Sequence, residues 1–497
     1  MKRLWIALLA LCLLLGGCSE DTPQAQTQQP EDTAVIRLSE HTVTVEGDEE
    51  AVTTANDIIF YPEGKDFTFG EGTDADAHEQ AEADAHTVVH ISKPGTYTLT
   101  GSMSAGQIAV DLGEDAEDDP YAVVTLILDN ADITCTVAPA IIFYNVYECG
   151  SKDTPTAAVD TSAAGANLVL AEGSVNHVSG SYVARIYKED TVELSEDGTE
   201  VLDAKKLHKY DGAVYSKMSM NVGGSGILNI DAENEGLDSE LHLTINGGEI
   251  YIRSGNDGIN TNEDGVSVTT MNEGLLDIVV NGRTGEGDGI DSNGWLVING
   301  GEVRAAACAS SADAGIDSDM GIEIHGGTVV ASGSMLDHIS HSQTCCVFTF
   351  SQKQAGKQEY ALKNADGETV VTAMPENDFS ILIMSCESLT AGEYSLWCGE
   401  TQLSATPGMG GGMRPGGMKF PGGERPEPPE GMEFPEGMEF PEGMEFPGGE
   451  MPESPEGMMP PQGGFGGRGP GDNMEQIGEA SAVLTVTEGE NYFIVTD

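Results

Sequence analysis

Positive charge is scarce in this chain of 497 residues. Lysine and arginine together number 22, aspartate and glutamate number 83, and the formal net charge is -61. General binders of nucleic acid or of anionic membranes need clustered cations, so the composition excludes both functions and predicts no nucleic-acid partner. A chain this acidic repels itself, and bound cations would relieve the repulsion.

Cysteine pairs and familiar hydrolase motifs are also missing. Apart from Cys12 and Cys18 the chain has seven cysteines, an odd number with no C-x-x-C spacing, which indicates neither a disulfide framework nor a zinc site. No H-E-x-x-H and no G-x-S-x-G occurs. The sequence therefore predicts no catalytic residue and favours a protein that is not an enzyme, without deciding the question.

Long hydrophobic runs are absent except for one at the start. Lys2 and Arg3 precede an apolar run from Leu4 to Leu15, which ends in Leu15-Gly16-Gly17-Cys18. The run is too short to span a membrane and is typical of a signal peptide, and its end resembles the bacterial lipobox. We therefore predict a lipoprotein signal peptide at 1–17, a lipid on Cys18, and anchoring at the extracellular face of the cell membrane through that lipid alone. An ordinary signal peptide is the alternative.

Two segments have the composition of unfolded chain. Residues 18–33 are rich in Gln, Thr and Pro, and residues 406–473 consist largely of Gly, Pro, Met and Glu in short repeats. Neither can bury enough apolar surface to fold. We predict a disordered tether at 18–33 and a disordered insert at 406–473.

The remaining chain is dominated by short strand signals. Segments such as 96–100, 123–128 and 241–245 are rich in β-branched residues and bounded by Gly, Asn or Asp, whereas amphipathic helices are scarce. The fold class predicted is all-β. Residues 345–497 are expected to form a small antiparallel unit, with a hairpin turn at Ala365-Asp366-Gly367 and closing strands at 482–486 and 492–495.

A repeat in the middle of the chain predicts the architecture. Four segments share Gly-(Leu/Ile)-(Asp/Asn)-(Ser/Thr) and begin at Gly236, Gly258, Gly289 and Gly315, with a degenerate earlier copy at Gly212. Successive glycines are 22, 31 and 26 residues apart, and three of the segments are followed by a Gly-Gly pair 11 residues on. Irregular periods of this length with a turn at a fixed phase indicate a solenoid. We predict a parallel β-helix over 34–344, with the apolar residue after each glycine pointing inward.

The turns of this repeat carry the strongest chemical signal. Equivalent residues of adjacent repeats would stack about 4.8 Å apart, and carboxylates at that distance repel by roughly 1 kcal/mol even in water. Calcium would offset this, because it accepts many oxygen ligands in loose geometry. The alternative is that Asp-Gly and Asn-Gly simply make good turns with solvated side chains. The candidate ligands are Glu235, Asp238, Asp257, Asn260, Asp288, Asp291, Asp313, Asp317 and Asp319.

One aromatic residue is placed to contact a sugar. Trp295 follows the third acidic turn directly, and an indole ring there could stack on a pyranose. A Trp packed against the protein is an equally good interpretation. Trp295 is the candidate carbohydrate-binding residue.

Several segments together resemble a known family. They are Lys93–Gly101, Gly106–Asp111, Leu128–Thr134 and Leu170–Asn176, followed by the acidic-turn repeats and the terminal unit, so the resemblance runs from about Ala51 to the end. They are similar to the secreted carbohydrate-binding-domain proteins of clostridia and their relatives. The resemblance implies a right-handed parallel β-helix that carries calcium and binds cellulose and polygalacturonate. Asn260, Asn262 and Ala314 depart from the acidic pattern.

The resemblance implies calcium-assisted binding of a plant cell-wall polysaccharide, either polygalacturonate or cellulose, at the bacterial surface. A protein this acidic should repel a polyuronate unless divalent ions bridge the two sets of carboxylates. Two alternatives stay open. One is a calcium-dependent pectate-type lyase, and the other is a structural surface protein or adhesin whose solenoid calcium makes rigid. The sequence leaves the oligomeric state open.

Overall fold

The computed structural model describes residues 32–40, 42–408 and 479–496. The predicted signal peptide, Cys18 and most of the predicted tether and insert lie outside these ranges. The described part is all-β, as predicted, with one short α-helix, α1 (Gln80–Ala83), and one 3-10 helix, η1 (Glu114–Asp118). None of its helices is long and apolar enough to cross a membrane.

Two sheets hold the repeats. The smaller one has eight strands in the order β22 (Ile290–Ser292), β20 (Ile259–Thr261), β18 (Glu235–Ser239), β15 (Gly212–Ser216), β8 (Ile141–Asn145), β6 (Gly106–Asp111), β4 (Thr87–Ile91) and β3 (Val52–Ala55). The larger one has 19 strands, namely β1 (Asp32–Leu38), β2 (Val43–Gly47), β5 (Gly95–Met103), β7 (Val124–Thr134), β9 (Ala166–Leu170), β10 (Val175–Gly180), β16 (Met220–Gly224), β17 (Ile227–Ala232), β19 (His242–Ser254), β21 (Val268–Val280), β23 (Trp295–Ile298), β24 (Glu302–Ala306), β25 (Gly321–Ile324), β26 (Thr328–Gly333), β27 (Ile339–Ser342), β28 (Cys345–Gln354), β31 (Phe379–Ser385), β34 (Ser404–Pro407) and β36 (Glu490–Thr496).

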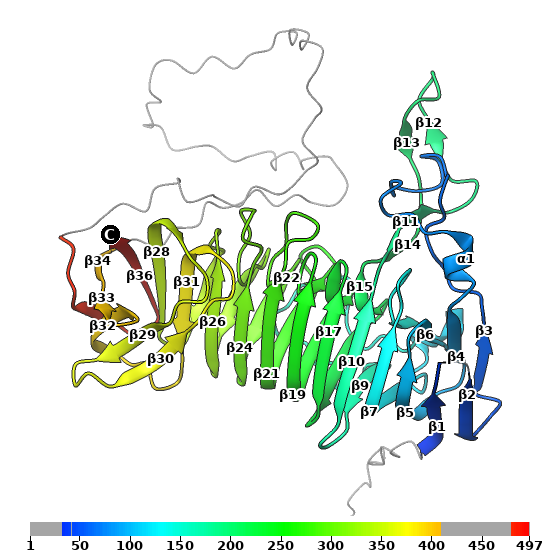
Figure 1. The fold of residues 1–497 in the computed structure, drawn as a ribbon, viewed down its shortest axis with the longest axis horizontal. Helices are drawn as coiled ribbons and strands as arrows, with labels where there is room; N and C mark the ends of the chain where they lie inside the picture. The colour runs from blue at the N-terminus through cyan, green and yellow to red at the C-terminus, as the bar shows by residue number, and fades with distance from the viewer. Residues whose placement is uncertain (1–31, 41, 409–478, 497) are drawn as a thin grey trace, which may run out of the picture.

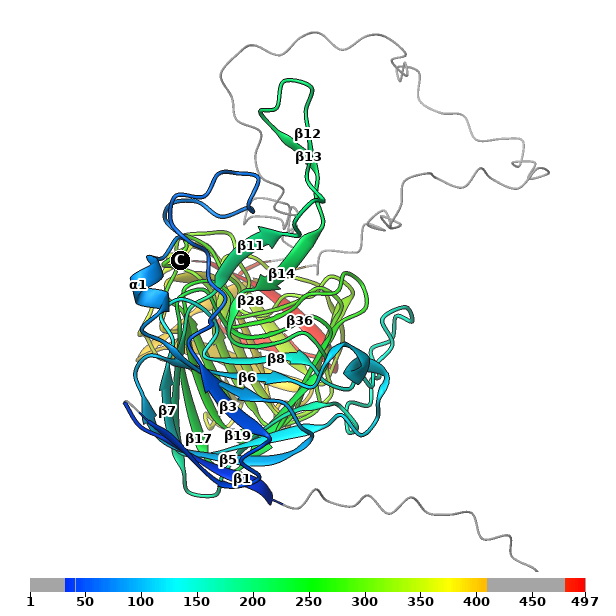
Figure 2. The ribbon, with the colours of Figure 1, turned by 90° about the vertical axis from the view of Figure 1, so that its right-hand side faces the viewer.

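Strands of successive repeats lie beside one another in parallel. In the smaller sheet Leu237 is level with Ile259, and Ile259 is level with Ile290, all three of them almost completely buried. The apolar residue after each repeat glycine therefore points into the core, as predicted. The strands are stacked along the long axis in chain order (Figure 1), and a view along that axis shows them enclosing the core (Figure 2).

Two long strands, β19 and β21, are bent at glycine so that each strand serves two faces. The first part of β21, residues 268–271, pairs with β23, and its second part, residues 275–279, pairs with β24. The bend in β19 contains Gly247 and Gly248, both with positive φ, which glycine adopts without strain. The repeats that begin at Gly212, Gly236, Gly258 and Gly289 each thus supply one short strand to the smaller sheet and two segments to the larger one.

The first glycine of three repeats, at Gly236, Gly258 and Gly289, is required by close packing against the next repeat. A Cβ on Gly258 would lie 2.6 Å from the carbonyl oxygen of Gly289. A Cβ on Gly236 would collide with the carbonyl oxygen of Gly258, and one on Gly289 with that of Gly315. Because the obstacle is backbone each time, the clash cannot be relieved by turning a side chain.

We therefore expect Gly258→Ala to lower the free energy of unfolding by about 2–4 kcal/mol, because overpacking against backbone forces neighbouring repeats apart. Gly223→Ala is the matched control, since its Cβ would meet nothing closer than Asn246 Cβ at 3.6 Å. Thermal unfolding followed by circular dichroism measures both. Equal melting temperatures for the two variants would contradict this explanation of the repeat.

The structure corrects the alignment of the earliest repeat. The sequence pattern equated Gly212 with Gly236, whereas Gly212 lies opposite Glu235 in the parallel pair of β15 and β18. The degenerate copy is therefore displaced by one residue. Its outward residue level with Asp238 is Tyr215, so the acidic column begins one repeat later than a glycine-based alignment suggests.

Antiparallel pairs occur at both ends. β1 pairs with β2 and β3 with β4, and β1 starts at Asp32, two residues inside the predicted tether. At the other end β31 pairs with both β26 and β28, so the terminal strands continue the larger sheet. The predicted turn at 365–367 joins an antiparallel pair. The smaller terminal sheet comprises β29 (Tyr360–Asn364), β30 (Thr369–Ala373), β32 (Gly392–Cys398), β33 (Thr401–Gln402) and β35 (Leu484–Val486).

Two further strand pairs project from the body between β10 and β15. β11 (Val183–Tyr187) pairs with β14 (Lys206–Tyr210), and β12 (Glu193–Leu194) pairs with β13 (Val201–Asp203) beyond it (Figure 2). The base of this projection matters for the site, because β14 leads directly into β15.

Candidate functional site

The repeats align the predicted acidic residues in columns. Asp238 lies level with Asn260, and Asn260 with Asp291, in the parallel register of β18, β20 and β22. A bridge between Ile290 and Ile316 brings the following residue, Asp317, into the same column. Residues that are 79 positions apart in sequence therefore form one line on the outside of the smaller sheet.

The side chains of the earlier repeats are shielded from solvent, which argues against simple solvated turns there, whereas Asp288, Asp291, Asp313 and Asp317 are half-buried. Asp238 is 0%, Glu235 4% and Asp257 8% exposed. Burial, and secondarily the neighbouring carboxylates, raises the pKa of Glu235 and of Asp317 to about 8 and that of Asp291 to about 6. The same causes raise the pKa values of Asp238, Asp257 and Asp288 well above normal. Asp319, by contrast, is exposed.

Backbone amides of a neighbouring repeat hold several of the carboxylates in place. The amide of Asp288 donates to Asp257 Oδ1 at 2.6 Å, and that of Ala314 donates to Asp288 Oδ1 at 2.5 Å. The amide of Gly287 donates to Asp313 Oδ2 at 2.6 Å. Each of these bonds joins two neighbouring repeats through one oxygen of a carboxylate. The donor is a neutral amide, so no positive charge balances the carboxylate.

The ammonium group of Lys209 lies beside the acidic columns where they begin, near Asp211 and Asn262. Lys209, at the end of β14, donates to Asn262 Oδ1 and lies 3.7 Å from Asp211 Oδ2. Burial would lower the pKa of Lys209, but Glu235, Asp211 and other carboxylates outweigh it and raise that pKa. Sequence reasoning missed Lys209 because it precedes the repeat. The one available signal was its position two residues before Asp211, at the start of the degenerate copy.

Three oxygens in this part have no hydrogen-bond partner although they are buried. They are Glu235 Oε2, Asp238 Oδ2 and Asn260 Oδ1. The side-chain Nδ2 of Asn260 donates to Glu235 Oε1 at 3.1 Å, so Glu235, Asp238 and Asn260 form one cluster. Glu235, Asp238 and Asn260 therefore stay candidate calcium ligands, and Lys209 brings a positive charge that would compete with an ion there.

The later repeats have no such cation. In the described ranges no lysine or arginine forms an ion pair with Asp257, Asp288, Asp291, Asp313, Asp317 or Asp319. Asp337, which the sequence pattern did not include, adds a further carboxylate beside Asp317. The donors are all oxygens, which suits calcium. However, no three His, Cys, Asp or Glu side chains among the residues with described positions converge as a ready metal centre.

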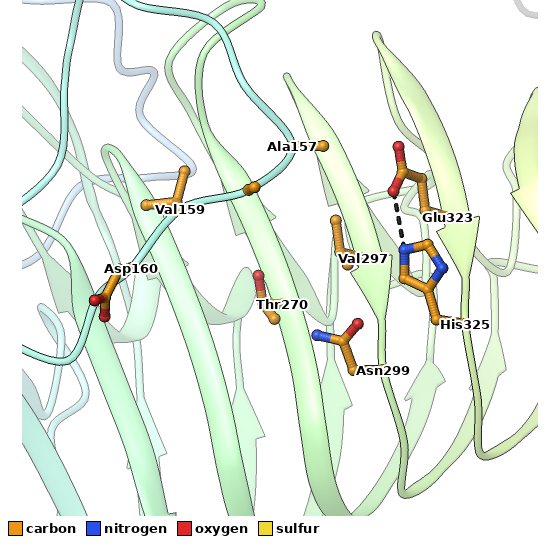
Figure 3. A pocket seen from close by; sticks show the side chains of 9 residues that line it. Ala157, Val159, Asp160, Thr270, Val297, Asn299, Glu323 and His325 are labelled. Carbon is orange, nitrogen blue, oxygen red and sulfur yellow. Dashed lines mark hydrogen bonds and ion pairs between the residues drawn. The ribbon is translucent and has the colours of Figure 1, made fainter.

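A groove of about 420 Å³ lies on a different face, over the larger sheet (Figure 3). Its floor is formed by outward side chains of β21, β23 and β25, where Thr270 is level with Val297 and Val297 with Glu323. A loop between β8 and β9 forms its other wall. The complete lining is Ala157, Ala158, Val159, Asp160, Thr270, Val297, Asn299, Glu323 and His325.

The groove combines apolar and hydrogen-bonding groups. Glu323 Oε2 lies 3.0 Å from His325 Nε2, and the Asn299 amide donates to Asn272 Oδ1 at 2.8 Å. Its lining includes two carboxylates, Asp160 and Glu323, and no lysine or arginine. The volume is within the range of ligand sites, and a few polar groups beside apolar wall residues are typical of them.

Trp295 lies on the same face as the groove. It is two residues before Val297 on β23, so both side chains point outward from the sheet. The indole is partly exposed and does not itself line the cavity. Trp295 is therefore placed beside the groove on the larger sheet, four residues after Asp291 of the acidic column.

Comparisons with known proteins identify a family that matches more than half of the chain. The sequence model of the family described as "Carbohydrate-binding domain-containing protein" matches residues 85–199 and 147–373, which together span more than half of the chain. A protein of that description from Acetivibrio thermocellus is 28% identical over 167 residues, 33% of this chain and 45% of that protein. The chain thus matches less than half the length of this curated relative.

A solved structure gives a weaker likeness. It is described as the polysaccharide lyase-like protein from C. thermocellum, gadolinium derivative. The match covers 59% of this chain and 92% of that one, with 20% sequence identity and a TM-score of 0.34.

Proposed function

Because the chain belongs to the family of carbohydrate-binding domain-containing proteins, we propose that it binds a plant cell-wall polysaccharide in the groove over β21, β23 and β25. The observation that carries the proposal is the open groove, with hydrogen-bonding groups on its floor and Trp295 beside it. A polymer needs a site open along the surface, and sugars bind through hydrogen bonds and stacking on aromatic rings.

The charge of the groove favours a neutral glycan. Asp160 and Glu323 would repel a polyuronate, and no cationic side chain of the lining would attract one. A cellulose-type glucan therefore suits the groove directly. Polygalacturonate would need divalent ions to bridge its carboxylates to those of the protein.

Calcium and the lipid anchor complete the proposal. Calcium would compensate the later acidic repeats, with Asp257, Asp288, Asp291, Asp313, Asp317 and Asp319 as the candidate ligands. A lipid on Cys18 would hold the protein at the extracellular face of the cell membrane. Support for the anchor comes from the sequence alone, because Cys18 lies outside the described residues.

The architecture proposed is a right-handed parallel β-helix. It is supported by the parallel register of equivalent residues from β15 through β22 and by the continuous core beneath them. The calcium-dependent lyase is not favoured, since the candidate calcium ligands lie on the smaller sheet, away from the groove and its His325. No observation favours a purely structural role over binding.

Affinity gel electrophoresis of the protein without its first 31 residues tests the proposal. Retardation by a soluble neutral β-glucan is expected with calcium and with chelator alike. Retardation by polygalacturonate is expected only with calcium. If neither polymer retards the protein in any condition, binding of cell-wall polysaccharide is refuted.

A further inference from the structure

Two histidines and a glutamate gather at the edge of the groove, on neighbouring strands. Glu323 lies on β25 and His325 directly follows that strand, so the two side chains, two residues apart, leave the same face of the sheet. His341 on β27 is level with Glu323 in the parallel pair of the two strands. Because adjacent strands lie about 4.8 Å apart, the three residues form a compact triangle.

The distances within this triangle are close to those between ligands of one metal ion. Glu323 Oε2 lies 3.0 Å from His325 Nε2 (Figure 3). The rings of His325 and His341 are 5.4 Å apart between centroids and inclined by 47°. With bonds of about 2.0–2.2 Å to zinc, a bound oxygen and nitrogen lie about 3 Å apart and the centroids of two bound imidazoles about 5 Å apart. The strands therefore already hold the three side chains at the spacing that one ion needs.

Little has to change for an ion to enter. The side chain of His325 is 39% and that of Glu323 28% exposed, and His341 is exposed as well. The hydrogen bond between Glu323 and His325 is held by one proton, whose place an ion can take. In the described ranges no three ligand side chains already converge on one point. His341 therefore has to turn about its side-chain bonds, which an exposed side chain does within nanoseconds.

We propose that Glu323, His325 and His341 bind a zinc ion or a chemically similar divalent transition metal. Two imidazole nitrogens and one carboxylate oxygen suit zinc, whereas calcium takes oxygen ligands. The site is thus chemically distinct from the acidic columns of the smaller sheet, whose candidate ligands are all oxygens.

The ion would face the groove. Glu323 and His325 both line it, and three protein ligands leave the fourth position of a tetrahedral ion open to water or another oxygen. The lining contains no lysine or arginine, so the ion would supply a positive charge that these residues lack. A sugar hydroxyl of a glycan in the groove can fill the open position. This last step rests on the proposed function, whereas the metal site does not.

Isothermal calorimetry of the full-length, chelator-treated protein tests the proposal, with zinc titrated into a solution that contains excess calcium. Calcium fills the sites made of oxygen alone, so one tightly bound zinc ion per chain is expected. His341→Ala and His325→Ala should each weaken its binding at least about tenfold, since even the loss of a partner behind a ligand costs about 10–100-fold. Both histidines are exposed, so the far-ultraviolet circular dichroism should be unchanged.

His78→Ala is the matched control. His78 Nδ1 lies 3.3 Å from Glu82 Oε2, so this histidine also pairs with a glutamate, but in another part of the chain. Its removal should leave the affinity for zinc unchanged. Undiminished zinc binding in both His325→Ala and His341→Ala would overturn the proposal, and so would displacement of the zinc by calcium. No glycan is present in the titration, so its result is independent of the proposed function.

Discussion

Metal-free protein is expected to lose thermal stability between about pH 4 and pH 8, and calcium is expected to restore it. Burial and mutual repulsion raise the pKa of Asp317 to about 8 and that of Asp291 to about 6, whereas unfolded aspartates titrate near 4. The folded state therefore binds more protons than the unfolded state across this window. Stability must then fall as pH rises, by about 1.4 kcal/mol for each unit of pKa difference.

Calcium should act in the opposite direction, because it binds the ionised carboxylates. At a concentration about 1,000 times its Kd a ligand that binds only the folded state adds about 4 kcal/mol. Melting temperatures measured from pH 5 to pH 8, with chelator and with calcium, should diverge as pH rises. Parallel curves in the two conditions would contradict calcium binding at the later repeats.

Isosteric variants give this prediction an internal control. Asp288→Asn removes one charge from the column while its oxygen can still accept the amide of Ala314. It should stabilise the metal-free protein at pH 8 and weaken the gain from calcium. Asp231→Asn, an exposed residue 71% accessible outside the column, should change neither. If the two variants behave alike, the acidic columns have no special role.

Removing the indole beside the groove should weaken binding. Trp295→Ala is expected to weaken the affinity for a neutral β-glucan at least about tenfold, because stacking by a buried or half-buried aromatic ring contributes 1–2 kcal/mol or more to recognition. Val297→Arg, which fills the floor of the groove, should abolish retention. Affinity gels or isothermal calorimetry with a soluble oligosaccharide measure both variants.

Trp397→Ala is the matched control for this prediction. Trp397 is also partly exposed, but it lies on β32 in the terminal sheet, where Lys363 Nζ is 4.3 Å from its ring centroid. Its removal should leave glycan affinity unchanged. A larger loss with Trp397→Ala than with Trp295→Ala would move the binding site to the terminal sheet.

Much of the fold could be predicted, because packing between neighbouring repeats requires the same residue types at the same positions. The glycine before each apolar residue is demanded by the backbone of the next repeat, and the inward Leu237, Ile259 and Ile290 follow from the pattern. The displaced register of Gly212 could not be predicted. The degenerate copy also contains a glycine, but that glycine lies level with Glu235 instead of Gly236.

The site was harder to predict than the fold. The acidic columns could be predicted, because equivalent residues of a repeat lie level with one another in parallel strands. Lys209 could not be predicted, because it lies on the projection between β10 and β15, outside the repeats. The groove wall at Ala157–Asp160 lies in the loop between β8 and β9, which no periodicity in the sequence connects to the repeats. Trp295 could be selected by residue type, but only the sheet shows that it shares a face with Val297 and Asn299.

Hydrogen–deuterium exchange with and without a soluble cello-oligosaccharide tests the central claim most directly. The account predicts slower exchange at residues 157–160, 295–299 and 321–325 when the sugar is present, in the presence of chelator as well as calcium. Protection confined to the acidic turns of the smaller sheet or to the terminal unit would contradict binding in the groove.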